Sequence, residues 1–334
     1  MPNQKIIEGL EPFNEIFYRD CFYNSFFPIV NYFKRDIFSF LVNDIVAYKE
    51  DNETSNLNFN IDYLSVNPFA QICSEECLIQ SECKEKSEDL VQDIIESINK
   101  ERPVIVFIDC YYEKIRPEMY KKVHWFHTIT VFGYDIEDKT FDIIEHKYKD
   151  NLGYMKRKIG FLELKECNDG FIQNCLEKVG NFAYSFYSFY LDKSLEENYY
   201  PKDKKSLCDT FKSNLLLKKQ EIVCGINSLE NFSKSLEEIV LKETVLKDKA
   251  EDILNIINNI INCKRVEQYK MNILYCENYE IINLIDLILE EWNRLRKVIV
   301  KYLVSGVYKV KDIEKAIESI KEIVELENIY IEKI

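Results

Sequence analysis

Residues 123–146 read VHWFHTITVFGYDIEDKTFDIIEH and have the pattern of a β-hairpin. The first arm, 127–132, is rich in β-branched and aromatic residues and ends at a break over 133–135, after which a second arm returns. A histidine, His127, opens the first arm, and a carboxylate, Glu145, closes the second. If the arms pair, these two side chains lie nearly opposite each other and close enough to touch. Such a carboxylate holds the imidazole in one tautomer, as a general base requires.

The returning arm offers two acidic residues that could orient His127. Strand alternation puts Glu145 and Asp142 on opposite faces, so the expected pairing favours Glu145, whereas a register shift of one residue favours Asp142. All three histidines of the chain lie in this hairpin. A zinc site made by His124 and His127 is an alternative, but their spacing suits a helix better than a strand, and no third ligand follows with zinc-like spacing. We therefore expect no metal.

The best candidate for the group that His127 activates is Cys21. Apolar residues recur at helical spacing over 22–33, and Asp20 is a favourable N-cap residue, which places Cys21 in the first turn of a predicted helix. A helix N-terminus carries partial positive charge and free N–H groups, and both favour a thiolate. Pro28 should kink this helix. The alternative is that Cys21 is an ordinary apolar helix residue.

Residues 104–108, VIVFI, predict a strand that is buried on both faces. Asp109 ends this strand and either caps the following loop or belongs to the site. Loops at strand ends commonly line binding sites. We therefore take Asp109, Tyr111, Tyr112 and Tyr120 as candidate substrate-binding residues, with ordinary surface tyrosines as the alternative.

The composition limits the classes of function. The chain has 334 residues, 46% of them hydrophobic, which is enough for one large or two ordinary domains. A net charge of −14 argues against binding to nucleic acid and to an anionic membrane surface. The N-terminal residues lack a secretory apolar segment, and no apolar run is long enough to span a membrane, so we expect a cytoplasmic protein. The eleven cysteines should then be mostly free thiols.

The character of the chain changes after residue 195. Aromatic residues dominate 182–190 and predict another strand, and a charged segment containing Pro201 follows. From there to the end, apolar residues recur three and four positions apart, which predicts four to six antiparallel helices packed as a bundle. We predict a catalytic domain over 1–195 and a helical domain over 205–334. The second domain would cover the first, shape a pocket wall or form a homodimer.

The ordered motifs resemble those of a known family. An early helix-starting cysteine is followed by PVIVFIDCYY at 103–112 and by HxxxxxGYD at 127–135. The last segment is similar to the histidine segment of papain-fold cysteine enzymes, and the whole set resembles the N-terminal domain of the H-type acyltransferases of butirosin biosynthesis. The low glycine content is similar to that of the amide-forming enzymes of closthioamide assembly. The resemblance covers about the first 190 residues by motif and implies an α+β papain-like fold followed by an α-helical bundle.

The resemblance also implies roles for individual residues. Cys21 matches the nucleophile and His127 the base, and Glu145 falls where the family usually has Asp or Asn. The chain departs from papain-type peptidases in one respect, because they carry a glutamine shortly before the cysteine that helps to bind the oxyanion. Asn14 is among the polar residues found in that region instead. The oxyanion hole would then use the Cys21 backbone N–H and a second, unidentified donor.

The implied activity is acyl transfer in nonribosomal-peptide or thioamide natural-product biosynthesis. The acyl group would pass from a thioester on the phosphopantetheine arm of a carrier protein to Cys21, and then to a small amine or diamine. No permanently bound cofactor is expected. The basic residues at 156–158, together with Lys202, Lys204 and Lys205, are candidate docking sites for an acidic carrier protein. The alternatives are a cysteine peptidase or amide hydrolase with the same dyad, and a degenerate domain that only binds.

Overall fold

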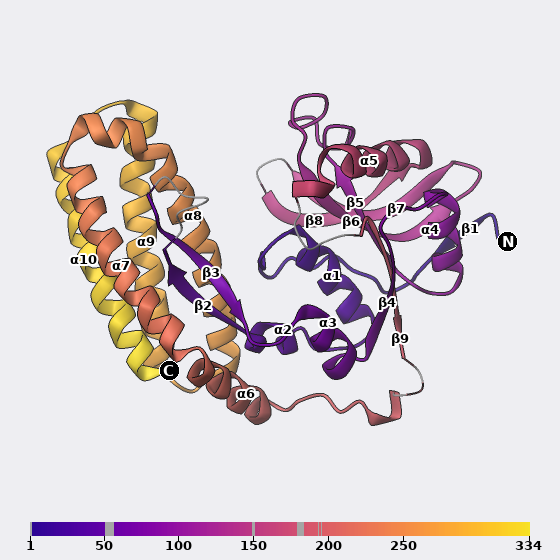
Figure 1. Cartoon of the computed structure of the whole chain (residues 1–334), viewed down its shortest axis with the longest axis horizontal. Coiled ribbons are helices and arrows are strands. Elements are labelled where there is room, and N and C mark those ends of the chain that lie inside the picture. The colour runs from indigo at the N-terminus through magenta and orange to yellow at the C-terminus, as the bar shows by residue number, and fades with distance from the viewer. Residues whose placement is uncertain (1, 51–56, 149–150, 179–183, 193, 195) are drawn as a thin grey trace. The chain divides into compact units, whose positions relative to one another are not determined.

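The computed structural model is an α+β protein with an antiparallel sheet and a C-terminal helical region (Figure 1). It describes residues 2–50, 57–148, 151–178, 184–192, 194 and 196–334. The chain forms two compact units, the first made of 1–37 with 69–201 and the second of 38–68 with 202–334. Among the helices of the described residues, none combines the length and the apolar character needed to cross a membrane.

The first unit is built on a seven-stranded antiparallel sheet with the strand order β4-β9-β5-β6-β7-β8, and β1 pairs with β6. Helix α1 packs on β5 and β6, and α5 packs on β5. The strands are β1 (Gln4–Ile6), β4 (Ile79–Lys84), β5 (Val104–Asp109), β6 (Phe126–Asp135), β7 (Thr140–Tyr148), β8 (Asn151–Gly160) and β9 (Phe186–Leu191). The helices are α1 (Cys21–Tyr32), α3 (Phe69–Gln71), α4 (Leu90–Asn99) and α5 (Phe161–Asn174), with short turns at Ile72–Glu76, Leu176–Lys178 and Glu196–Asn198.

The predicted hairpin is present as β6 and β7, but the expected break at 133–135 is wrong. Strand β6 continues to Asp135, and the turn follows it. Gly133 lies beside Ile6 of β1 and Asp142 of β7, and a Cβ atom there would meet Asp142 Oδ2 at 2.8 Å. This glycine therefore permits close packing within the strand and does not end it.

Two other strand predictions are tested by the sheet. All residues of β5 are buried, and β5 lies between β9 and β6, which confirms the prediction for 104–108. The predicted strand over 182–190 begins only at Phe186, while 182 and 183 lie outside the described residues. Aromatic side chains fill the space between α1 and the sheet, where the Phe22 ring centroid lies 6.0 Å from that of Phe107.

The second unit contains the predicted helical bundle together with a hairpin that the sequence had assigned to the first domain. Five helices lie between residues 202 and 334, within the predicted range of four to six. The elements are α2 (Phe38–Asn43), β2 (Asp44–Lys49), β3 (Asn60–Ser65), α6 (Lys204–Leu217), α7 (Lys219–Val240), α8 (Glu243–Leu274), α9 (Tyr279–Ser305) and α10 (Val310–Lys333). The predicted boundary between 195 and 205 lies close to the change of unit at Pro201, but 38–68 groups with the helices.

Buried polar contacts explain why the β2–β3 hairpin belongs to the helical unit. The Tyr48 hydroxyl of β2 donates to Glu327 of α10 and accepts from the Trp292 Nε1–H of α9 at 3.3 Å. Gly225 of α7 touches the same strand, because a Cβ there would lie 2.3 Å from the Tyr48 carbonyl oxygen. Local residue patterns carry no information about such distant partners. The sequence analysis therefore assigned the hairpin to the first domain.

Candidate active site

The position of Cys21 follows from the N-terminal cap of α1. Asp20 has extended backbone, and its carboxylate accepts the N–H groups of Phe22 and Tyr23 at 2.9 and 3.3 Å, which confirms the predicted cap. Cys21 is therefore the first residue of the helix. Its N–H has no acceptor among the described residues and is one of the free donors of a helix start. The helix remains a single element across Pro28.

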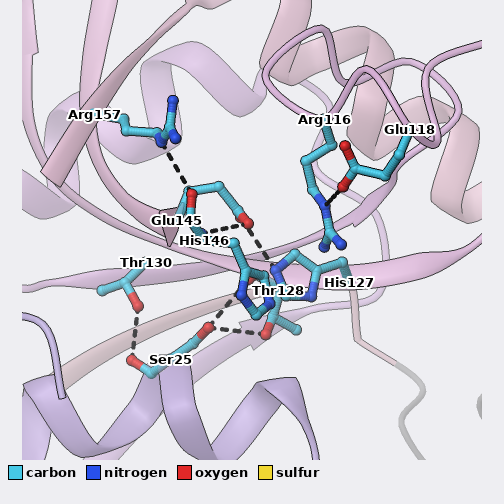
Figure 2. A network of polar contacts seen from close by, with 9 residues as sticks. All are labelled: Ser25, Arg116, Glu118, His127, Thr128, Thr130, Glu145, His146 and Arg157. Atoms are coloured by element: carbon cyan, nitrogen blue, oxygen red, sulfur yellow. Dashed lines mark hydrogen bonds and ion pairs between the residues drawn. The ribbon is translucent and has the colours of Figure 1, made fainter. Parts of the chain in front are cut away.

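Three hydroxyl-containing residues fasten α1 to β6. The Ser25 hydroxyl contacts the Thr128 hydroxyl at 2.9 Å and its carbonyl oxygen at 3.1 Å, and the Thr130 hydroxyl donates to the Ser25 carbonyl at 2.7 Å (Figure 2). Cys21 lies one helical turn before Ser25, on the same face of the helix. His127 directly precedes Thr128. This attachment brings the cysteine of the helix to the histidine of the strand.

Cys21 is half-buried and lies beside His127 and Glu145, which are both buried. The His127 imidazole lies close enough to Cys21 for the two side chains to interact electrostatically. His127 Nε2 lies 3.1 Å from Glu145 Oε2, with the two side chains 3% and 0% exposed (Figure 2). Because Nε2 faces the carboxylate, Nδ1 is the nitrogen left for the sulfur. The Nε2–Oε2 pair has the distance of an ion pair without the angles of a hydrogen bond, so charge attraction holds it.

The register of the hairpin explains why Glu145 reaches His127. Thr130 pairs with Ile144, which places Glu145 beside Ile129. His127 is two residues before Ile129, so the contact is diagonal across the ladder. Asp142, the alternative partner, pairs with Gly133 at the other end of the hairpin, on the face opposite to Glu145. The geometry selects Glu145.

The charges of this group support one another. Burial lowers the pKa of His127, but the Glu145 carboxylate and Cys21 outweigh burial and raise that pKa well above its usual value. Burial raises the pKa of Glu145, but the neighbouring His127 outweighs it and lowers the pKa below its ordinary value. Both shifts favour an imidazolium–carboxylate pair at neutral pH. Removing either charge should therefore alter the protonation of the other group.

If Cys21 and His127 act as nucleophile and base, we expect Glu145→Gln to reduce the rate of their reaction by about 10²-fold and to move the alkaline limb of the pH profile to lower pH. The amide retains the size of the carboxylate but not the charge that keeps His127 protonated as the pH rises. Steady-state rates measured between pH 5 and 10 test this. Asp142→Asn is the matched control and should leave both rate and profile unchanged. An effect of Asp142→Asn as large as that of Glu145→Gln would contradict the assignment.

His146 contacts Glu145 and forms, with His127 and Glu145, a set of three residues of types that bind metal ions. Its backbone N–H donates to Glu145 Oε1 at 2.7 Å, and one ligand atom each from His127, Glu145 and His146 lies within 4.8 Å of the others. The two imidazole rings stack at 5.1 Å with 27° between their planes. Nitrogen lone pairs lie in the ring planes, so stacked rings do not direct them to a common point. Stacking therefore argues against coordination of one ion by both imidazoles.

Asp109 closes the loop that carries the predicted binding tyrosines. It is fully buried, and its Oδ1 accepts the N–H groups of Tyr111 and Trp125 at 3.0 and 3.2 Å. Its Oδ2 lies 2.6 Å from His124 Nδ1. Asp109 thus joins the two ends of the loop. Of its two predicted roles, this is the loop cap, and a buried carboxylate with these partners does not present itself to a substrate.

The three tyrosines of this loop surround a lysine. The Lys121 ammonium lies 5.0, 4.5 and 5.6 Å from the ring centroids of Tyr111, Tyr112 and Tyr120, which are cation–π distances. The Tyr111 ring also stacks on His124 at 4.2 Å. All three tyrosines are partly exposed. Their predicted contact with a substrate stays a prediction.

The same loop brings two ionisable residues close to His127 that the sequence analysis did not single out. Glu113 is fully buried, and its carboxyl oxygens have no nitrogen or oxygen partner among the described residues; only the weak thiol donor of Cys110 is near. The Arg116 guanidinium points toward His127 (Figure 2). Burial, and then the charge of Glu145, raise the pKa of Glu113 well above its usual value. An acidic residue in a polar loop normally indicates a solvated surface, so residue type and context could not reveal this buried acid.

Glu113→Gln is expected to stabilise the protein at pH 8 but hardly at pH 5. The folded state keeps Glu113 protonated, whereas the unfolded chain ionises it above its ordinary pKa near 4.5. The free energy of unfolding therefore falls by at most about 1.4 kcal/mol per pH unit above that value, and glutamine escapes this loss. Scanning calorimetry at both pH values measures the difference. The exposed Glu137→Gln serves as control, and an equal shift in Tm at pH 5 and pH 8 would contradict the prediction.

Asn14, whose side chain carries an amide as glutamine does, has a different use. Asn14 accepts the Tyr154 N–H at 2.5 Å and donates to the Tyr154 carbonyl at 3.0 Å. Its side-chain amide is thereby committed to strand β8. Asn14 holds Tyr154 in place and does not replace the glutamine as an oxyanion donor.

No protein-family model matches this chain, and no curated protein resembles it significantly in sequence. The geometry of Cys21, His127 and Glu145 is therefore the main evidence for what the site does.

Proposed function

We propose that this protein is a cysteine-dependent acyltransferase of papain-like fold that forms amides from thioesters. The observation that carries the proposal is the arrangement of Cys21 at the start of a helix, beside His127, whose Nε2 faces the buried Glu145. A nucleophile, a base and a group that orients the base are the three parts that covalent acyl transfer requires. The ordered motifs of the first 190 residues support the same class of reaction.

The first half of the reaction acylates the enzyme. The Cys21 thiolate, having given its proton to His127, attacks the carbonyl carbon of an acyl thioester. The carbon–sulfur bond of the donor then breaks, and its thiol leaves with the proton held by His127. One thioester replaces another, so this exchange is nearly balanced in free energy. We propose that the donor thiol is the phosphopantetheine arm of a carrier protein.

The second half forms the amide. A small amine or diamine attacks the acyl-enzyme, His127 takes a proton from the attacking nitrogen, and the bond to Cys21 breaks with the sulfur as leaving group. Water competes for the same intermediate, so the outcome depends on a positioned amine and a dry site. The near-complete burial of His127 and Glu145 supports such exclusion of water.

The surface that would receive the carrier protein stays a proposal. Of the basic residues at 156–158, Lys156 pairs with Glu11 at 2.6 Å, and Arg157 Nε donates to the His146 carbonyl at 3.1 Å (Figure 2). Both are already engaged next to the site. The group made by Lys202, Lys204 and Lys205 remains the other candidate for an acidic carrier.

Product analysis tests the proposed function. The purified protein is incubated with an acyl-pantetheine and a diamine, with the acyl-pantetheine alone, and with unstructured peptides. We expect amide as the main product, slow hydrolysis without amine and no cleavage of peptides, and we expect Cys21→Ala to abolish the amide. Peptide cleavage or exclusive hydrolysis would instead identify a peptidase or an amide hydrolase. Full activity of Cys21→Ala would rule out covalent catalysis by this residue.

A further inference from the structure

The proposed reaction needs a second hydrogen-bond donor that the residues described so far do not supply. Attack on a thioester places negative charge on the carbonyl oxygen, and enzymes stabilise it with at least two aligned donors. The Cys21 N–H is one, because it stands free at the start of α1. Asn14 is not the other, since its amide holds the backbone of Tyr154.

The Tyr154 hydroxyl is an unused donor close to the site. Tyr154 pairs with His146 across β7 and β8, and the two rings stack with centroids 4.3 Å apart. The ring of His146 in turn stacks on that of His127. The side chain of Tyr154 is 3% exposed, and its hydroxyl has no hydrogen-bond partner within the described ranges. An unpaired buried hydroxyl destabilises the folded state, so a position that keeps one calls for an explanation.

The Tyr154 hydroxyl interacts electrostatically with the first turn of α1. Burial, and then the charges of Cys21 and Glu145, raise the pKa of Tyr154 well above its usual value, with a smaller contribution from Asp20. Cys21 and Asp20 are the first residue and the cap of α1. Tyr154 thus remains neutral and keeps its proton at any pH at which the enzyme would work, as a hydrogen-bond donor must.

Asn14 fixes Tyr154 where the donor is needed. Its side chain forms a pair of hydrogen bonds with the N–H and the carbonyl of Tyr154, as a neighbouring strand would. Asn14 lies in the segment that leads to Cys21, so the same segment carries the nucleophile and positions β8. The Tyr154 ring itself is restrained by its stacking on the His146 ring.

We propose that the Tyr154 hydroxyl is the second donor of the oxyanion hole and acts together with the Cys21 backbone N–H. The inference rests on the proposed acyl transfer and deepens it by naming a further catalytic residue. The hydroxyl donates a hydrogen bond to the thioester oxygen as charge develops there, and no proton is transferred. Tyr154 would perform the role that glutamine has in papain-type peptidases.

Two reactions of the same cysteine separate this role from a structural one. Acylation of Cys21 by an acyl-pantetheine passes through an oxyanion, whereas alkylation by iodoacetamide displaces iodide at a saturated carbon and forms none. We expect Tyr154→Phe to slow acylation by about 10²–10³-fold, the typical loss for one donor. The alkylation rate of Cys21, followed by peptide mass mapping, should stay within about twofold of the native rate, since alkylation has no oxyanion for the donor to stabilise.

Tyr134→Phe is the matched control, because Tyr134 is a buried tyrosine of the same sheet whose hydroxyl donates to Asn99 at 2.9 Å. It should leave both rates unchanged. If Tyr154→Phe is acylated at the native rate, the inference is overturned while the proposed function stays intact. The same holds if the rates of acylation and alkylation fall equally. If the native protein forms no acyl-enzyme at Cys21, the proposed function itself is wrong. The native sample alone shows this, without the variants.

Discussion

Replacing Cys21 by alanine is expected to lower the rate of amide formation by about 10⁴–10⁶-fold, and replacing His127 by alanine should cost nearly as much. Cys21 forms the covalent bond and His127 moves the proton that this step requires, so the loss of either residue stops the same step. Only the effects of substrate binding and of the oxyanion donors then remain. The Cys21→Ala/His127→Ala double variant should therefore be no slower than the single variants. Single-turnover formation of amide from an acyl-pantetheine and a diamine measures all three rates.

Cys83→Ala is the control for the loss of a thiol, because Cys83 is a partly buried cysteine of the edge strand β4. It should keep the native rate. Losses that multiply in the double variant would mean that Cys21 and His127 contribute independently. A His127→Ala variant that keeps more than a tenth of the native rate would remove the histidine from the mechanism.

The largest expected effect on stability lies in the second unit, at Lys264. Its ammonium is buried and contacts Glu267 Oε2 at 3.0 Å and Glu327 Oε2 at 2.8 Å. Burial lowers the pKa of Lys264, but the two carboxylates outweigh burial and raise it. Lys264→Met leaves these carboxylates buried without a cation. We expect it to reduce the free energy of unfolding of this unit by about 3–5 kcal/mol at pH 7.

Tryptophan fluorescence can report the unfolding of the second unit separately. The chain has two tryptophans, of which Trp292 is buried in the second unit and Trp125 is exposed in the first. In a Trp125→Phe background, urea unfolding followed by fluorescence reports the surroundings of Trp292. The exposed Lys234→Met is the control and should change stability by less than about 0.5 kcal/mol. A loss for Lys264→Met no larger than that of the control would show that the buried charges are not coupled.

The sequence predicted the parts of the site that depend on local pattern. Asp20 precedes an apolar helical stripe, so the cap and the place of Cys21 followed from residue type and spacing. The contact between His127 and Glu145 was predicted from their positions at the two ends of the hairpin, because two-residue periodicity assigns each side chain to a face of the strand. The actual contact is diagonal, since a register irregularity between Val131 and Gly133 is invisible in residue types.

What the sequence missed depends on contacts between distant segments. Glu113 and Tyr154 have ordinary loop and strand contexts, and only the packing of the loop and of β8 against the dyad makes them buried and unpaired. Residues 38–68 belong to the helical unit because Tyr48 meets Trp292 and Glu327, more than 240 positions away in the chain. Gly133 was taken for a turn residue because glycine more often serves turns than close strand packing.

Intact-protein mass spectrometry can detect the acylation of Cys21 itself. The native protein is mixed with an acyl-pantetheine in the absence of amine, quenched in acid and then digested for peptide mapping. We expect one added acyl group, carried by the peptide that contains Cys21 and released as amide when a diamine is added before the quench. An acyl group on a different cysteine, or no adduct while amide still forms, would contradict it.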